Sequence, residues 1–316
     1  MSATLLAPEA IERFPCLGGS CAVIVGGAGP VGTASRAAAV ARRRLRIWHR
    51  QLSRFDPRSE LSRLNRDPRD TVPASPVMIS FVEAAVSASA TTGGLVDPTL
   101  AGELETAGYA SDLAEPSFGL AEALQAAPAR RAARPRQVAR WRWVRVDRAA
   151  GTVTRPAGLR LDSGGIAKGL FGDLLAAALA GHPAFAIDAA GDVRIGGRAS
   201  LAREVRVASP FEDEVLHTFI LRGGAAATSG IGRRSWCDRA GQPCHHILDP
   251  ATGRPAFTGV VQATALAPTG VQAEALAKAA LLAGADLATS HLHHGGVVVY
   301  DDGGHEVVEP PTPKTR

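Results

Sequence analysis

The sequence predicts an α+β fold, in which strands are joined as antiparallel hairpins and a few longer helices pack against them. Two observations support this prediction. Short apolar runs recur between glycine-containing or polar turns at the spacing of hairpins. Only a few longer segments have a helical composition, so the chain lacks the regular alternation of strand and helix that a doubly wound parallel sheet requires.

The predicted strands are short and rich in apolar residues. They cover residues 21–25, 143–146, 152–154, 184–189, 204–207, 216–221, 260–266 and 296–300. The second and third of these form a hairpin, with residues 147–151 as its turn. A glycine-rich segment, residues 191–197, is expected to form another turn.

The predicted helices differ in length and in how clearly they end. They cover residues 33–52, 59–64, 77–91, 115–140, 166–180 and 272–282. The segment at 115–140 is rich in Ala, Pro and Arg, and its flanks are expected to be loose. Glycines mark two of the ends: Gly93 and Gly94 follow the helix at 77–91, and Gly284 follows the last helix.

The 316 residues are enough for one large domain or two ordinary ones, and no internal repeat divides them. We expect a single domain over residues 1–306, followed by a Pro-rich, disordered tail at 307–316. The first residues lack a basic segment followed by a long apolar one, and no stretch is long enough to cross a membrane. These features predict a cytoplasmic protein without membrane insertion.

The composition argues against nucleic acid as a partner. The 35 basic and 30 acidic residues give a net charge of +5, and the densest basic run, residues 129–142, is typical of a solvated surface. Only 5% of residues are aromatic and no aromatic ladder accompanies the arginines, so nucleic acid is not an expected partner. The cysteines have neither zinc-site nor disulfide-framework spacing and are expected to be free, buried thiols: Cys16, Cys21, Cys237 and Cys244.

Glycines at 27, 29 and 32 match a dinucleotide-binding pattern between a strand and a helix. That motif also needs a second strand ending in an acidic residue about twenty positions later. No apolar strand precedes Asp56, so an ordinary glycine-rich loop is favoured here. A nicotinamide-dependent oxidoreductase remains only a weak alternative.

The stretch LDSGGIAKG, residues 161–169, is the strongest local indication of a ligand. Asp162 and Ser163 can cap the helix that follows, and the glycine pair lets a ligand approach the backbone where the helix N-terminus favours an anion. Lys168 lies in the first turn, where a cation opposes the helix dipole. A positive charge in that place suggests a phosphorylated ligand.

Five segments in this order resemble the ApbE-like FAD:protein FMN transferases. They are SRFDPRSELSRLN, GGLVDPT with the later AGY, LDSGGIAKG, ATSG and HHILDPATGRP. The turn at 189–197 and the helix containing AEALAKA match as well, so the resemblance extends from about Leu17 to Tyr300. It implies a T-fold-like α+β domain, with mostly antiparallel sheets and flanking helices. It also implies FAD as a substrate, whose FMN part moves onto a Ser or Thr hydroxyl of an acceptor flavoprotein while AMP is released.

The same resemblance implies roles for individual residues. Asp162 and Lys168 match positions that contact FAD, with Asp162 also counted among the catalytic residues. His246 matches the histidine that accepts the proton of the acceptor hydroxyl, a role that a near-neutral pKa suits. Two hydroxyl donors near the phosphates are implied at Thr228 and Ser229. The positions that line the flavin and adenosine pockets are Leu17, Phe55, Leu95, Val96, Asp97 and Leu248.

The metal site departs from the family pattern. Relatives carry an Asp and a Thr four residues apart on one helix, which bind Mg²⁺ together with the backbone carbonyl at the position of Gly165. Here the two positions are Glu274 and Lys278, and an ammonium cannot coordinate a cation. Either Lys278 takes the metal's place, held by a salt bridge to Glu274, or a weakened Mg²⁺ site survives on Glu274, Gly165 and waters. A catalytically impaired, flavin-binding family member is therefore a second hypothesis.

Overall fold

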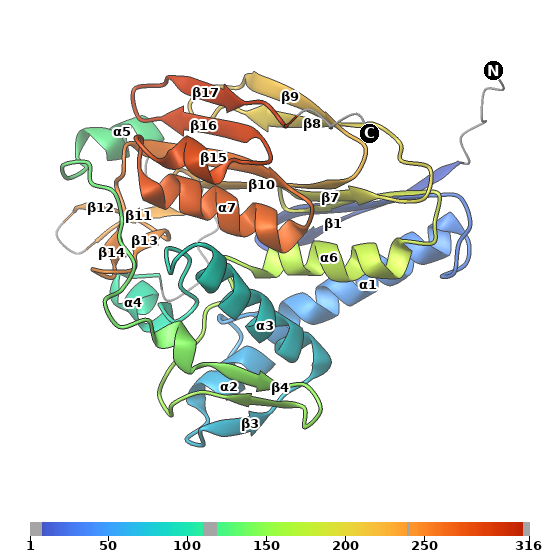
Figure 1. Cartoon of the computed structure of the whole chain (residues 1–316), viewed down its shortest axis with the longest axis horizontal. Helices are drawn as coiled ribbons and strands as arrows, with labels where there is room; N and C mark the ends of the chain where they lie inside the picture. The colour runs from blue at the N-terminus through green and yellow to red at the C-terminus, as the bar shows by residue number, and fades with distance from the viewer. Residues whose placement is uncertain (1–7, 110–118, 239–240, 312–316) are drawn as a thin grey trace.

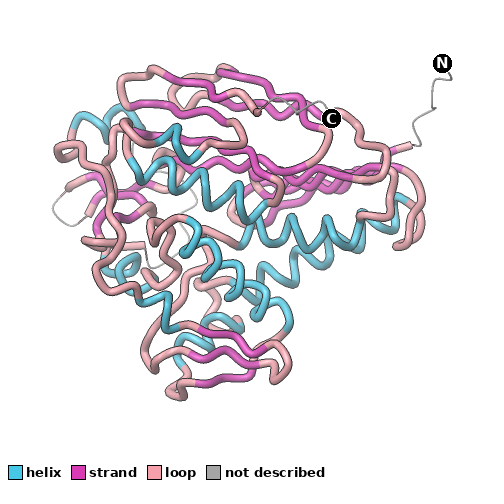
Figure 2. Tube along the Cα trace, in the orientation of Figure 1, coloured by secondary structure: helices cyan, strands magenta, loops and turns pink. Residues whose placement is uncertain are grey.

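The computed structural model describes residues 8–109, 119–238 and 241–311. Its centre is an eight-stranded sheet in which all neighbouring strands are antiparallel (Figure 1). Together with the helices that lie beside the sheet (Figure 2), this arrangement confirms the predicted α+β fold. In order across the sheet, the strands are β1 (Glu9–Cys16), β2 (Gly19–Gly26), β6 (Ala184–Ala189), β7 (Asp192–Gly196), β10 (Gly224–Gly230), β15 (Val260–Ala267), β16 (Gly296–Tyr300) and β17 (His305–Val308).

Three helices pack on one face of this sheet, and a fourth packs on them (Figure 1). The three are α1 (Ala34–Leu52), α6 (Ala167–Leu179) and α7 (Gly270–Ala283), and the fourth is α3 (Pro76–Thr91). All four agree with the predicted helices to within two residues at each end. Their ends are defined by local chemistry: Thr33 and Ser75 accept hydrogen bonds from the first free N–H groups of α1 and α3, and Gly284 ends α7 with a positive φ of 82°.

The other face of the sheet is covered by a hairpin, β8 (Arg203–Ala208) with β9 (Val215–Leu221). Side chains alternate between faces along a strand, and Arg194 contacts Asp173 of α6, so its neighbour Ile195 faces away from the helices. Ile195 shares one apolar core with the hairpin residue Phe219. The middle of the sheet is therefore buried on both faces, whereas Ile11 of β1 at one edge is 47% exposed.

A smaller layer below the helices carries the loops that form the site (Figure 1). It contains a three-stranded sheet and several short elements. They are α2 (Glu60–Arg66), β3 (Thr71–Pro73), α4 (Ala101–Thr106), η1 (Arg140–Trp143), β4 (Arg145–Asp147) and β5 (Thr152–Thr154). The remaining short elements lie at the left in Figure 1: α5 (Leu120–Gln125), β11 (Ser235–Cys237), β12 (Pro243–His245), β13 (Leu248–Asp249) and β14 (Arg254–Pro255). One further 3₁₀ turn, η2 (Ala288–His291), follows α7.

Helices α6 and α7 meet at two glycines. A Cβ built on Gly169 would lie 2.3 Å from the carbonyl oxygen of Gly270, so the backbones touch with no room for a side chain. Asp173 of α6 accepts hydrogen bonds from the N–H groups of Gly270 and Val271, at 2.8 and 3.0 Å, and so caps α7. This contact sets the spacing between the residues that both helices contribute to the site.

Several sequence predictions are wrong in detail. Within 115–140 the described helix is only α5, because Pro128 and Pro135 cannot continue a helix, and residues 110–118 lie outside the described residues. The strand expected at 143–146 begins at Arg145, after a 3₁₀ turn. The segment 191–197 is mostly strand β7, since Ile195 is buried in the sheet and Val193 is partly buried, and only the start is a turn.

Both ends of the central sheet were also misjudged. Strand β1 was not predicted, and it forms a hairpin with β2. The tail expected from residue 307 begins later, because Val307 and Val308 pair with β16 in strand β17. Residues 312–316 lie outside the described residues, so the rest of that prediction stays a prediction. Among the cysteines, Cys237 is exposed, unlike the other three.

The glycine loop between β2 and α1 is a structural turn. Gly29 and Gly32 bridge to each other, and a Cβ on Gly29 would lie 2.6 Å from the ring of His182. The His182 ring therefore fills the space in which a dinucleotide-binding loop would hold phosphates. In the described part of the chain, no helix is long and apolar enough to cross a membrane.

Candidate active site

Two cavities adjoin each other beneath the sheet, where the loops of the lower layer meet α6 and α7. Asp162, His246 and Lys278 line both of them, together with Leu104. The first cavity encloses about 790 Å³ of space, part of it open to solvent. Its other lining residues include Leu17, Ser53, Arg54, Phe55, Tyr109, Lys168 and Arg234. The second cavity is more apolar, with Leu95, Val96, Asp97, Leu100, Gly165, Ile247 and Leu248 among its lining residues.

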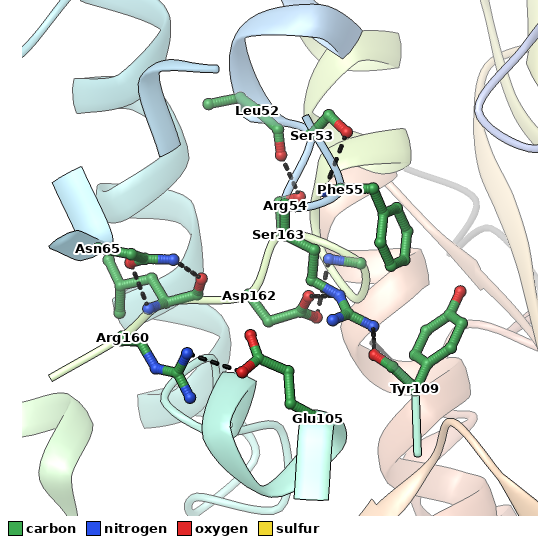
Figure 3. Close-up of polar contacts among 12 residues, drawn as sticks. Leu52, Ser53, Arg54, Phe55, Asn65, Glu105, Tyr109, Arg160, Asp162 and Ser163 are labelled. Atoms are coloured by element: carbon green, nitrogen blue, oxygen red, sulfur yellow. Dashed lines mark hydrogen bonds and ion pairs between the residues drawn. The ribbon is translucent and has the colours of Figure 1, made fainter. Parts of the chain in front are cut away.

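Asp162 forms an ion pair that the sequence did not reveal. Its Oδ1 lies 3.0 Å from Nε of Arg54, and both side chains are largely buried (Figure 3). The Arg54 guanidinium carbon lies 4.3 Å from the ring centroids of both Phe55 and Tyr109, and Arg54 also donates to the Tyr109 carbonyl at 2.7 Å. Arg54 is thus held between two aromatic rings and a carboxylate. Arg54 stands next to Phe55 in the motif SRFDP, and this was the only feature of the sequence that could have placed Arg54 in the site.

The predicted capping of α6 by Asp162 and Ser163 is wrong. The N-cap residue of α6 is Ile166, which makes no side-chain cap. Asp162 Oδ2 instead accepts from the N–H of Gly164 at 3.0 Å, and Ser163 Oγ donates to the carbonyl of Leu52 at 2.7 Å. The Ser163 bond ties the turn to the end of α1, and the Asp162 bond stays within the turn. The helix begins only after Ile166, too far along for either side chain to cap it.

Asn65 and Pro98 hold the Asp162 segment in place. The amide of Asn65 donates to the carbonyl of Leu161 and accepts from its N–H, both at 2.8 Å (Figure 3). The N–H of Asp162 donates to the carbonyl of Pro98 at 2.8 Å. Three segments far apart in the sequence are therefore joined at the backbone of Leu161 and Asp162.

Lys168 has an anionic partner within the protein. Its Nζ lies 2.9 Å from Oδ2 of Asp192, which begins strand β7. Burial alone would lower the pKa of Lys168, but Asp192 and Glu274 together raise it. The charge in the first turn of α6 is thus explained by Asp192, and a ligand is not required to account for it.

Glu274 is buried on α7 and accepts a hydrogen bond from the N–H of Gly169 at 2.8 Å. Burial, followed by the nearby charge of Asp192, raises the pKa of Glu274 to about 7. The carboxylate therefore joins α7 to the start of α6, and it lines neither cavity.

Lys278 lies against Gly165. A Cβ built on Gly165 would lie 1.9 Å from Nζ of Lys278, so the ammonium occupies the space directly beside that glycine. Among the described residues no ion pair within 4.0 Å involves Lys278, so the predicted salt bridge to Glu274 is wrong. Burial lowers the pKa of Lys278, while the charges of Glu274 and Asp162 oppose that shift.

These contacts do not suit a magnesium ion at Gly165. The ammonium fills the space beside Gly165, and one Glu274 oxygen is already used by the N–H of Gly169. Mg²⁺ prefers several oxygen ligands in octahedral geometry. Over residues 8–109, 119–238 and 241–311, no group of three or more His, Cys, Asp or Glu side chains could hold a metal ion.

His246 contributes the imidazole shared by the two cavities. Its Nδ1 lies 3.4 Å from the carbonyl oxygen of Arg234, and a carbonyl only accepts, so Nδ1 carries the hydrogen and Nε2 keeps its lone pair. Burial, and after it the charges of Arg234 and Lys278, hold the pKa of His246 well below 6.5. The ring is therefore neutral at pH 7 and able to accept a proton.

The other predicted residues divide into two groups. Leu17 and Phe55 line the first cavity, and Leu95, Val96, Asp97 and Leu248 line the second. Thr228 and Ser229 line neither. The Thr228 hydroxyl is hydrogen-bonded to that of Thr264 at 2.8 Å. Sequence reasoning missed Arg54, Tyr109 and Arg234, whose contacts join distant segments.

Comparison with known proteins agrees with this geometry. Residues 17–300 match the ApbE family. The chain is 29% identical over 290 residues to an FAD:protein FMN transferase of Rhodobacter capsulatus, covering 89% of this chain and 53% of the relative. It is 33% identical over 145 residues to one of Treponema pallidum, covering 40% of this chain and 39% of the relative. The chain thus spans about half the length, or less, of these curated relatives.

Solved structures give the same result. The ApbE protein of Thermotoga maritima superposes with a TM-score of 0.76 at 27% identity, covering 96% of this chain and 97% of that one. The flavinyl transferase ApbE of Pseudomonas stutzeri shares the fold, with a TM-score of 0.74 at 21% identity, covering 98% and 96% of the two chains. Because the family match covers most of the chain and the fold agrees over nearly its full length, this protein belongs to the ApbE family.

Proposed function

We propose that this protein is an FAD:protein FMN transferase, which moves the FMN part of FAD onto a Ser or Thr hydroxyl of an acceptor flavoprotein and releases AMP. The observation that carries this proposal is the pair of adjoining cavities that share Asp162, His246 and Lys278. A dinucleotide has two ring systems joined by a diphosphate, which suits two cavities joined at polar groups. Family membership and the names of the relatives support the same activity.

In this proposal the first cavity takes the flavin and the second takes the adenosine. Phe55 and Tyr109 offer aromatic faces in the first, where a flat ring system can stack. Leu95, Val96 and Leu248 give the second its apolar walls. One carboxylate oxygen of Asp97, Oδ2, is buried without a hydrogen-bond partner among the described residues, and a ligand donor can satisfy it.

The proposed site retains Asp162 and Lys168 and omits Thr228 and Ser229. Asp162 lines both cavities, and Lys168 lines the first. The two hydroxyl residues line neither cavity. The proposal also assigns no role to the Mg²⁺ that was expected at Gly165 and Glu274, because the residues present there do not suit a magnesium ion.

The transfer is a displacement at phosphorus. The hydroxyl oxygen of the acceptor attacks the phosphorus of the FMN part, a new P–O ester bond forms, and the P–O–P anhydride bond breaks to release AMP. The proton of the hydroxyl passes to Nε2 of His246, whose other nitrogen is held by the carbonyl of Arg234. Positioning of the diphosphate and neutralisation of its charge supply the remaining catalysis.

The proposal is tested by incubating the protein with FAD and an acceptor domain that carries an exposed Ser or Thr. We expect AMP in solution and fluorescent flavin attached to the acceptor on a denaturing gel. An acceptor with that Ser or Thr changed to Ala is the control, and it should remain unlabelled. Absence of both AMP and attached flavin, with and without Mg²⁺, would contradict the activity. No observation favours the impaired flavin-binding protein or the nicotinamide oxidoreductase.

The proposed base also makes a prediction about pH. A group whose pKa is depressed stays neutral until the pH falls through that lowered value, so kcat/KM should be maintained below pH 6.5 and fall only in more acid solution. The measurement is AMP release at low FAD concentration from about pH 5 to about pH 9. An acid limb centred at or above pH 6.5 would contradict the role of a buried, neutral His246.

A further inference from the structure

Lys278 is a cation placed where the two cavities meet. It comes from the middle of α7 and is half-buried, and its Nζ lies beside Gly165. In the described residues its ammonium has neither an ion pair within 4.0 Å nor a hydrogen bond to the protein. A partly desolvated ammonium without a direct partner is costly, so this position favours a bound anion.

The neighbouring charges leave a positive excess at the same place. Arg54 is paired with Asp162, and Lys168 is paired with Asp192. Beyond these pairs, Lys278 and Arg234 both line the first cavity. Of the other nearby carboxylates, Glu274 lines neither cavity and Asp97 lines only the second. The two cations therefore face a cavity whose own carboxylate, Asp162, is already neutralised by Arg54.

A divalent cation would add to this excess. It would have to displace the ammonium from Gly165 and would stand among Lys278, Lys168 and Arg234, with repulsion that grows as water is excluded. A diphosphate has the opposite effect, because its negative charges match the two cations that lack carboxylate partners. The chemistry of the site therefore favours a diphosphate bound without a metal.

We propose that Lys278, assisted by Arg234, binds the diphosphate of FAD in place of a divalent cation, so that this protein binds FAD without a metal. The inference rests on the proposed function only for the identity of the ligand. Transfer would then also proceed without added metal, since the ammonium neutralises the charge that develops at phosphorus when AMP leaves.

The test is a titration of the protein with FAD, followed by flavin fluorescence, in EDTA and in Mg²⁺. The dissociation constant should agree within about twofold between the two conditions. Lys278→Met keeps an unbranched side chain, one atom shorter, and removes the charge. It should weaken FAD binding at least about tenfold in EDTA, equivalent to about 1.4 kcal/mol. Arg206→Met is the matched control, because it removes an exposed cation of strand β8 away from both cavities, and it should leave the affinity unchanged.

A second variant keeps the inference testable if Lys278→Met fails to fold. Gly165→Ala keeps the lysine charge but puts a methyl group in the space that the ammonium occupies, so it should also weaken FAD binding in EDTA. Calorimetric titration of Mg²⁺ into the protein–FAD complex should release or absorb no heat beyond dilution. A wild-type protein that binds FAD only with Mg²⁺, or a folded Lys278→Met that binds FAD normally in EDTA, would overturn the inference.

These outcomes are separable from the proposed function. Tight, Lys278-dependent FAD binding in EDTA without any AMP release would uphold the inference and contradict the transferase. Transfer that requires Mg²⁺ would uphold the transferase and contradict the inference.

Discussion

Replacement of His246 with alanine is expected to slow flavin attachment by about a hundredfold to ten-thousandfold, the usual contribution of a general base. The neutral ring has its Nδ1 hydrogen held by the carbonyl of Arg234, so Nε2 is available for the proton of the acceptor hydroxyl. Alanine leaves that proton without an acceptor in the site. The measurement is single-turnover transfer of flavin to an acceptor domain at saturating FAD.

The same variant should bind FAD with nearly unchanged affinity, because a neutral imidazole provides no charge for the diphosphate. His49→Ala is the matched control, since His49 lines the first cavity but not the second, and its effect on transfer should be no more than a few-fold. If His246→Ala lost FAD binding and transfer to the same extent, His246 would be a structural residue. If His246→Ala left the rate of transfer unchanged, His246 would not be the general base.

Replacement of Gly169 with alanine is expected to lower the free energy of unfolding by about 3 kcal/mol. The added Cβ would lie 2.3 Å from the Gly270 carbonyl oxygen, a backbone atom that cannot rotate away. This strain exceeds the roughly 1 kcal/mol that alanine gains over glycine in helix propensity. Calorimetry should show a fall in Tm of about 5 °C.

Activity should fall in Gly169→Ala as well, because separating α6 from α7 disrupts the bond from the Gly169 N–H to Glu274 and shifts Lys168 relative to Lys278. Gly172→Ala is the control in the same helix. Its added Cβ would lie 3.1 Å from Cβ of Arg194, a tight contact but a much milder one than the 2.3 Å contact at Gly169. Equal Tm values for the two variants would show that the contact between the helices does not limit stability.

Local patterns predicted the long helices well. Helices α1, α3, α6 and α7 have strong composition signals and are bounded by residues such as Thr33, Ser75 and Gly284, whose chemistry acts within one turn. The weaker predictions failed where tertiary burial decided the outcome. Strand β7 was taken for a glycine turn because its flanking glycines are visible in the sequence, whereas its pairing with β6 and β10 is not.

The site residues also fall into those that the sequence predicted and those that only the tertiary structure revealed. Most residues that the order of motifs assigned to one site line the two cavities: Leu17, Phe55, Leu95, Val96, Asp97, Asp162, Gly165, Lys168, His246 and Leu248. Thr228, Ser229 and Glu274 were assigned to the same site and line neither cavity. Arg54 was missed, although it pairs with Asp162 and lies between Phe55 and Tyr109. Tyr109 is 55 residues away from Arg54 along the chain, so no periodicity or spacing joins them.

By itself, the sequence determined the α+β class, the long helices and part of the set of residues that line the cavities, because composition, capping and motifs can be read without knowing which segments pack together. The tertiary structure decided the charge partners. It paired Lys168 with Asp192 and Asp162 with Arg54, and it placed the ammonium of Lys278 beside Gly165 instead of in a salt bridge with Glu274. Electrostatic energy depends on distance and burial, and both are set only when distant segments pack together.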